Sequence, residues 1–128
     1  MLRLAQYAVA AFTAVLIVPG PATSFAAESI SFAGDVFPIL EVRCLECHKP
    51  GGDGFVESGL DLRTYKGLMK GTKHGPVVVP GSAVTSNFIV LVEGRAAEEL
   101  RMPHNRKKLT KCEIGILRRW VNSGANNN

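Results

Sequence analysis

Residues 44–48, CLECH, place two thiols three positions apart and follow the second directly with an imidazole. Three kinds of site use this set of side chains. A haem can form thioether bonds to both cysteines and take the histidine as an iron ligand. A zinc ion can bind thiolates and imidazole, and two thiols at this spacing can form a redox-active pair. On a helix, positions i, i+3 and i+4 share a face, so Cys44, Cys47 and His48 are expected to address one group.

The rest of the chain separates these three interpretations. Zinc would need two further ligands, and the candidates, Cys112 with His74 or His104, lack regular metal-ligand spacing. A dithiol of the thioredoxin type occurs beside a βαβ pattern, and the sequence shows only weak strand signals. The C-x-x-C-H pattern is the attachment signature of a c-type haem, so haem is the favoured group.

The first 26 residues have the layout of a secretory signal peptide. One charge, Arg3, precedes an apolar run from about residue 5 to residue 18, followed by the helix breakers PGP and the small-residue pattern Ser24-Phe25-Ala26. The run is shorter than the roughly 20 residues that span a bilayer, so we expect cleavage after Ala26 rather than a retained anchor. Residues 27–128 would then form one exported, periplasmic domain.

The charge of the chain is mildly basic. The net charge is +4, and it falls to +3 without Arg3, which is too small an excess to argue for nucleic acid. No second hydrophobic segment suggests a membrane span, so we expect no span after signal cleavage.

Short helices joined by long loops are predicted over the remaining residues. A first helix is predicted over residues 31–47, with Asp35 as a candidate cap and a stripe of apolar residues, Phe32, Val36, Ile39 and Leu40. Residues 49–59, KPGGDGFVESG, predict a loop because they are rich in glycine. Further short helices are predicted over residues 64–71 and 85–94. Thr110 and Glu113 form a capping box at the start of a last helix that stops at Gly124.

Several motifs in order resemble the planctomycete-type cytochrome c domains, a branch of the class I cytochromes c. They are DVFPILEVRCLECH, SGLDLRTYKGLMKG, GPVVVPGS, RMPH, KLT and LRRWVNSGA, and they extend over about residues 31–125. The resemblance implies a small all-α domain in which short helices enclose one covalent haem c, with the first and last helices crossing. It implies thioether bonds at Cys44 and Cys47, a proximal iron ligand at His48 and a role in electron transfer.

The second axial ligand of the iron is predicted to be Met102. Of the three methionines, Met1 leaves with the signal peptide and Met69 lies in a predicted helix, whereas Met102 lies in a polar, cationic segment without a core stripe. Pro103 favours an extended backbone at Met102. His104 is the competitor, because residues i and i+2 of an extended segment share a side; the family usually has a non-ligating residue there.

These residues predict a one-electron carrier rather than an enzyme. The alternatives are a haem sensor or peroxidase-like enzyme with a labile sixth ligand, and a haem subunit of a larger oxidoreductase. The expected partners are redox proteins with acidic surfaces, which would meet the cations Arg101, Arg106, Lys107, Lys108 and Lys111. The third cysteine, Cys112, is interpreted as a small residue at the edge of the last helix.

Overall fold

The computed structural model describes residues 29–128, which form short helices joined by loops, with no strand among those residues. The predicted signal peptide, residues 1–26, lies outside the described part. The elements in chain order are η1 (Phe32–Val36), α1 (Phe37–Arg43), α2 (Asp53–Ser58), α3 (Tyr65–Lys70), α4 (Asn87–Val92), η2 (Glu98–Leu100) and α5 (Lys111–Asn122). The prediction of a small all-α domain with long loops is confirmed. Within the described residues, no helix has the length and apolar character that a membrane span requires.

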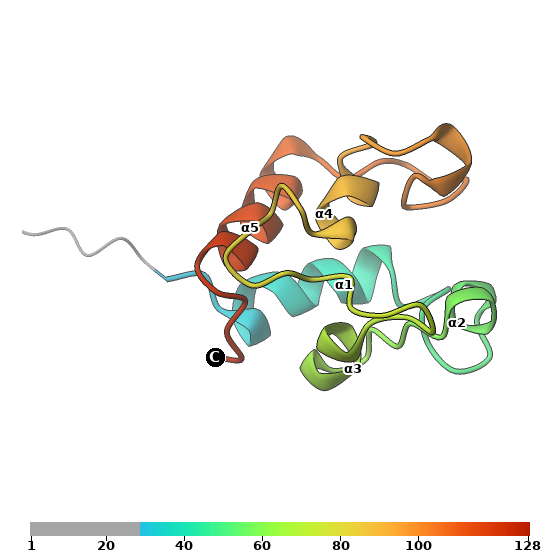
Figure 1. Ribbon diagram of the computed structural model, residues 1–128, viewed down its shortest axis with the longest axis horizontal. Helices are drawn as coiled ribbons and strands as arrows, with labels where there is room; N and C mark the ends of the chain where they lie inside the picture. The colour runs from blue at the N-terminus through green and yellow to red at the C-terminus, as the bar shows by residue number, and fades with distance from the viewer. Residues whose placement is uncertain (1–28) are drawn as a thin grey trace, which may run out of the picture.

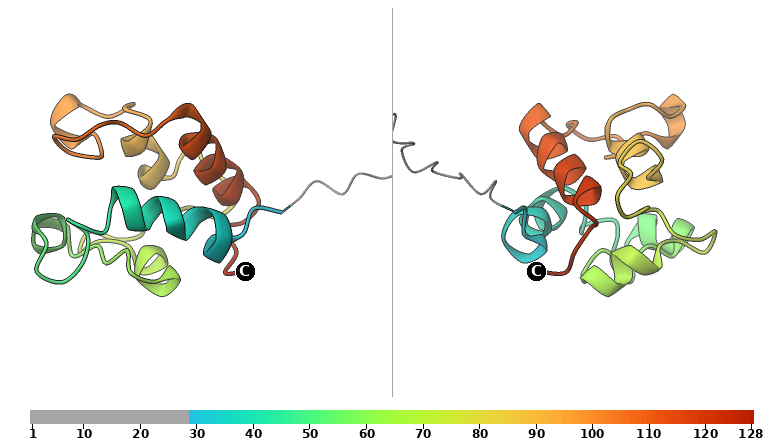
Figure 2. Two further views of the ribbon diagram at one scale, coloured as in Figure 1. Left: turned by 180° about the vertical axis from the view of Figure 1, so that it is seen from behind. Right: turned by 60° about the vertical axis from the view of Figure 1, so that its left-hand side comes forward.

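The helices form two groups around α1. Helices α4 and α5 lie on one side of α1, and α2 and α3 lie on the other (Figure 1). The first described residues and the C-terminus lie side by side (Figure 2), where the Phe32 amide donates to the Asn128 side chain at 2.9 Å. The long connection from α4 to α5 lies at the opposite end of the molecule from the described termini, and α2 lies at this same end (Figure 1).

The start of the first helix packs against the last helix through aromatic side chains. The ring centroids of Phe32 and Trp120 lie 5.5 Å apart, and Tyr65 meets Phe32 edge-on at 5.2 Å. Trp120 is fully buried, and its indole N–H donates to the Asn126 carbonyl at 2.9 Å. The predicted crossing of the first and last helices is therefore present, and Tyr65, which donates to the Ala125 carbonyl, belongs to this cluster.

Local sequence signals predict the bounds of α3 and the start of α5 correctly. Thr110 accepts from the Glu113 amide at 3.2 Å, and the Glu113 side chain accepts from the Thr110 amide at 2.6 Å, so the predicted capping box is present. Thr64 caps α3, which ends at Gly71 as predicted. Gly71 has a φ of 80°, a conformation that glycine adopts without the steric cost of a side chain.

Three predictions about residues 31–59 are wrong. The first helix ends at Arg43 rather than continuing through the cysteines, and its cap is Ser31, whereas Asp35 accepts from the Ser31 amide. Residues 49–59 are not all loop, because α2 covers Asp53–Ser58. Two of the glycines that suggested a loop, Gly52 and Gly54, are required by close packing, which is described below.

Removing the cap of α5 is expected to destabilise the protein. Thr110→Ala removes the side-chain acceptor for the Glu113 amide and should lower the free energy of unfolding by about 1 kcal/mol. Thr110→Ser keeps the acceptor and is the matched control. Chemical denaturation monitored by far-UV circular dichroism measures both variants, and an unchanged Thr110→Ala midpoint would contradict the role of the box.

Candidate functional site

A cavity of about 350 Å³ lies between the end of α1, α2, α4 and the segment before α5. Its wall is mainly apolar, with Leu60, Leu62, Phe88, Leu91 and Val92. Its chemically active side chains come from two segments, the cysteine segment (residues 43–48) and the strap (residues 101–110) that connects η2 to α5. The cavity therefore lies where segments far apart in the chain meet.

The cysteine segment continues α1 as a single turn rather than as a regular helix. The amides of Cys47 and His48 both donate to the Cys44 carbonyl, at 3.2 and 3.0 Å. This turn places Cys44, Cys47 and His48 in the wall of the same cavity. This arrangement is consistent with the expectation that the three side chains bind one group. A turn rather than a helix brings them together.

Helix α2 packs directly against the cysteine segment, and glycine makes this possible. A Cβ atom on Gly52 would lie 2.4 Å from the Cys47 carbonyl oxygen, and one on Gly54 would lie 2.8 Å from Cε1 of His48. The Phe55 amide donates to the Cys47 carbonyl at 2.9 Å. The backbone of the cysteine segment is thus held by α2, and any larger side chain at these two positions would push it away.

The His48 imidazole is buried in a manner that suits a metal ligand. Burial lowers its pKa, an effect partly offset by the Leu60 backbone, so the ring is favoured in its neutral form. Its backbone carbonyl accepts from the Leu62 amide at 2.9 Å. The buried Nδ1 atom has no hydrogen bond of normal geometry, although the Leu60 backbone is close enough to influence the ring. A buried polar atom without a partner is uncommon and calls for an explanation, which a group bound in the cavity would provide.

The strap carries the other predicted ligand residues. Met102 is partly buried against the hydrophobic core, and its amide donates to the Leu91 carbonyl at 3.1 Å. His104 also lines the cavity but is exposed. Asn105 follows with a φ of 52°, a left-handed conformation that asparagine tolerates better than most residues. Both candidate ligands thus reach the cavity, and only Met102 is packed into the core.

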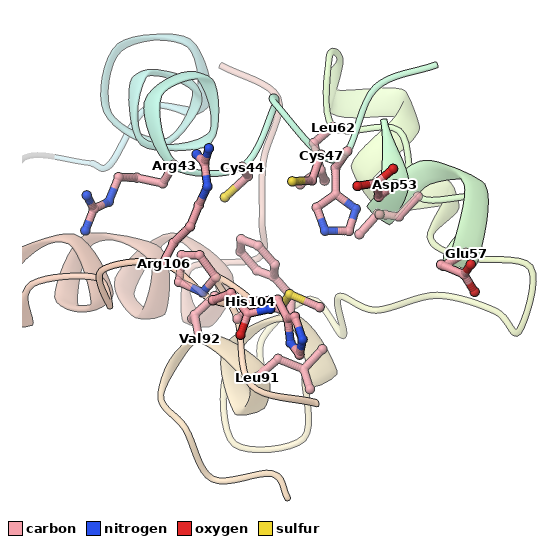
Figure 3. A pocket seen from close by; sticks show the side chains of 17 residues that line it. Arg43, Cys44, Cys47, Asp53, Glu57, Leu62, Leu91, Val92, His104 and Arg106 are labelled. Atoms are coloured by element: carbon pink, nitrogen blue, oxygen red, sulfur yellow. The ribbon is translucent and has the colours of Figure 1, made fainter. Parts of the chain in front are cut away.

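Charges of opposite sign lie at different parts of the cavity rim. Figure 3 shows Arg43 and Arg106 beside Cys44, whereas Asp53 and Glu57 stand beyond Cys47, on α2. His104, Leu91 and Val92 lie across the cavity from the two cysteines (Figure 3). Neither Arg43 nor the two carboxylates were predicted from the sequence, because only the packing of α2 and the strap brings them to the rim. The i, i+4 spacing of Asp53 and Glu57 could have indicated a common face, had α2 been predicted.

The zinc and dithiol interpretations gain no support from this geometry. Among residues 29–128, no three His, Cys, Asp or Glu side chains are grouped as a metal site would require. His74 and Cys112 are exposed and do not line the cavity. Burial raises the pKa of the Cys44 thiol to about 11, whereas redox-active dithiols depend on a lowered pKa.

Most residues of the cavity wall lie in the part of the chain that matches a known family. Residues 44–105 match the family model for the planctomycete cytochrome C. This match supports a cytochrome c domain of the planctomycete type over these residues. Comparison with curated proteins and with solved structures returned no match.

The cytochrome c family implies a covalently bound haem c, and the residues present fit this group. Two cysteines and a neutral imidazole line a mainly apolar cavity whose volume is within the range of cofactor pockets. Gly54 leaves the space against the imidazole that any side chain would take. Haem-binding therefore follows from the family and agrees with the chemistry of the wall.

Filling the space at Gly54 is expected to disturb the His48 imidazole. Gly54→Ala should displace the ring, lower the free energy of unfolding by about 1–3 kcal/mol and change the absorption spectrum of the haem protein. Gly115→Ala is the matched control, because its nearest atom would be Arg119 Nη1 at 3.6 Å and alanine favours the interior of α5. A Gly54→Ala protein with the wild-type spectrum and stability would show that the close approach is unimportant.

Proposed function

We propose that the protein is a periplasmic one-electron carrier with a single haem c. Cys44 and Cys47 hold the haem through thioether bonds, and His48 and Met102 are the axial iron ligands. The observation that carries this proposal is the convergence of His48 and Met102 on one apolar cavity, from the cysteine segment and from the strap. One haem agrees with the one CxxCH motif in the sequence.

The surroundings of Met102 favour a carrier over a sensor or a peroxidase-like enzyme. The Met102 side chain is packed against the core, and its backbone is tied to α4, so the thioether is pre-positioned. Two axial ligands leave no open site for a substrate at the iron. A neutral sulfur ligand also raises the reduction potential, which suits a protein that accepts electrons. The haem itself supplies the redox chemistry, and the chain supplies the ligands and the apolar cavity.

Export follows from the N-terminal sequence as part of the same proposal. Residues 1–26 have the layout of a signal peptide, and haem attachment to CxxCH is typical of exported cytochromes. A free carrier and a subunit of a larger oxidoreductase share this export and this site. The exposed cations on the strap favour a protein that meets its partners through charge.

The partners we propose are redox proteins with an acidic surface. Lys107, Lys108 and Lys111 are exposed and form no ion pair with any residue between 29 and 128. Lys107 borders two hollows next to the main cavity, so positive charge lies beside the proposed haem site. Such a field concentrates anionic partners near the site and raises the association rate at low salt.

The sixth ligand is tested by substitution of Met102. Oxidised wild-type protein should show the weak sulfur-to-iron charge-transfer band, and a pyridine haemochrome assay should give one haem per chain. Met102→Ala should abolish the band and lower the midpoint potential by on the order of 0.1 V, since axial ligands determine much of the potential.

The control for this test is Met69→Ala, which removes a methionine that packs on the core outside the cavity. It should keep the band. Wild-type protein without the band, together with a Met102→Ala spectrum that is unchanged, would remove Met102 as the ligand. A low-spin spectrum that is lost only in Met102→Ala/His104→Ala would identify His104 as able to bind in its place.

The proposed docking surface is tested by charge reversal on the strap. Lys107→Glu/Lys108→Glu should slow oxidation of the reduced protein by hexacyanoferrate(III), an anionic oxidant, by about tenfold at low salt. The difference should shrink at high salt. Lys66→Glu/Lys70→Glu is the matched control, because it makes the same change of net charge on α3, which does not border the cavity. Stopped-flow absorption measures the rates, and equal slowing in both variants would argue against a local surface.

A further inference from the structure

The strap has little internal support where it crosses the cavity. Residues 102–106 all line the cavity, and none belongs to a regular helix or strand. The strap is fixed at its two ends, by the hydrogen bond from the Met102 amide to Leu91 and by the buried side chain of Leu109. A contact from outside the strap is therefore needed between these two ends.

Arg43 supplies that contact. It is the last residue of α1 and directly precedes Cys44. Its Nη2 atom donates to the Lys108 carbonyl at 2.7 Å and lies 3.4 Å from the Lys107 carbonyl. The Arg43 side chain is only 19% exposed, whereas its two hydrogen bonds reach exposed residues of the strap; the charge of the guanidinium makes such bonds stronger than neutral ones. One guanidinium thus joins the cysteine segment to two consecutive peptides of the strap.

A fixed carboxylate orients the guanidinium. The Arg43 Nε atom lies 3.3 Å from Oε1 of Glu113, an ion pair that lacks hydrogen-bond geometry, and the other carboxylate oxygen of Glu113 accepts from the Thr110 amide. Burial raises the pKa of Glu113, but hydrogen bonds from Thr110 and the charges of Arg43 and Lys107 outweigh this effect and lower it. Glu113 is therefore ionised near neutral pH and is held by the start of α5. It places a fixed negative charge beside the Arg43 guanidinium.

A second link joins the same two segments but contributes less. Arg106 in the strap pairs with Glu46 in the cysteine segment. These side chains are 42% and 69% exposed, and exposed ion pairs contribute little to stability. The half-buried Arg43 is therefore the principal connection.

We propose that Arg43 is a positioning residue that latches the strap to the cysteine segment and so keeps Met102 on the haem iron. The inference rests on the proposed His48 and Met102 ligation. The protein would then control access to the iron with a residue adjacent to the haem attachment site, since α1, the cysteines and the Met102 strap are tied together at one edge of the cavity. When the latch is removed, the strap moves away from the cavity more often, so that an external ligand binds the iron more readily.

Binding of imidazole to the oxidised haem protein tests the latch. Arg43→Gln removes the charge and the forked donor, and it should increase the affinity for imidazole about tenfold, the change expected when a charged hydrogen bond is lost. It should also weaken the sulfur-to-iron band. Arg43→Lys keeps the charge but cannot reach both carbonyls in the same geometry, so its imidazole affinity should lie between those of the wild type and Arg43→Gln.

Arg118→Gln is the matched control. Arg118 also joins α5 to another element through a partly exposed ion pair, with Glu93, but it makes no contact with the strap. Its imidazole affinity should equal that of the wild type. If Arg43→Gln and Arg118→Gln increase the affinity equally, the effect is general loosening and the latch is overturned.

Glu113→Gln provides a second test away from the haem attachment site. Glutamine still completes the capping box but no longer offers Arg43 a charge, so the affinity for imidazole should rise by a smaller factor. If Arg43→Gln fails to fold or to attach haem, a wild-type affinity in Glu113→Gln overturns the proposal. If the wild type has the sulfur-to-iron band and Arg43→Gln has the wild-type imidazole affinity, the latch alone is overturned. If the wild type lacks the band, the proposed Met102 ligation is overturned as well.

Discussion

The packing of Phe32 against Trp120 is the contact on which the arrangement of the site depends. It joins η1 to α5, and the same two helical segments lead to the two sides of the cavity. The cysteine segment follows α1 without an intervening loop, and the strap ends where α5 begins. Once the crossing is formed, the end of α1 and the start of α5 are held near each other. Arg43, at the end of α1, can therefore reach the capping box of α5.

The two sides of the cavity are held by different means. Backbone hydrogen bonds from Phe55 and Leu62 hold Cys47 and His48, and the glycines of α2 allow close contact. The strap, in contrast, has no regular secondary structure and relies on its ends and on Arg43. We therefore expect the His48 side to be the more rigid and the Met102 side to be where ligand exchange begins, because segments with few buried contacts open at lower free energy.

The sequence predicted those elements whose signals are local. The α5 capping box, the stop of α3 at Gly71 and the apolar stripe of the first helix depend on residues within one or two turns of each other. Helix α2 was missed because its glycines are also typical of loops, and the reason for them, contact with Cys47 and His48, is visible only in three dimensions. The charged rim was missed for the same reason. His48 and Met102 were singled out from spacing and from the polar surroundings of Met102, and both line the cavity.

The opposed charges at the rim would shift the reduction potential of a haem in the cavity in opposite directions. Arg43 and Arg106 favour the reduced, less positive state of a haem iron, whereas Asp53 and Glu57 favour the oxidised state, as Coulomb's law requires. The arginines also hold the strap, so their positions are constrained by the latch as well as by the charge. The carboxylates lie on α2, whose backbone is pinned to the cysteine segment. With the proposed ligation, the reduction potential could be changed through Asp53 and Glu57 without disturbing the strap, whereas a change at Arg43 would alter both the potential and the retention of Met102.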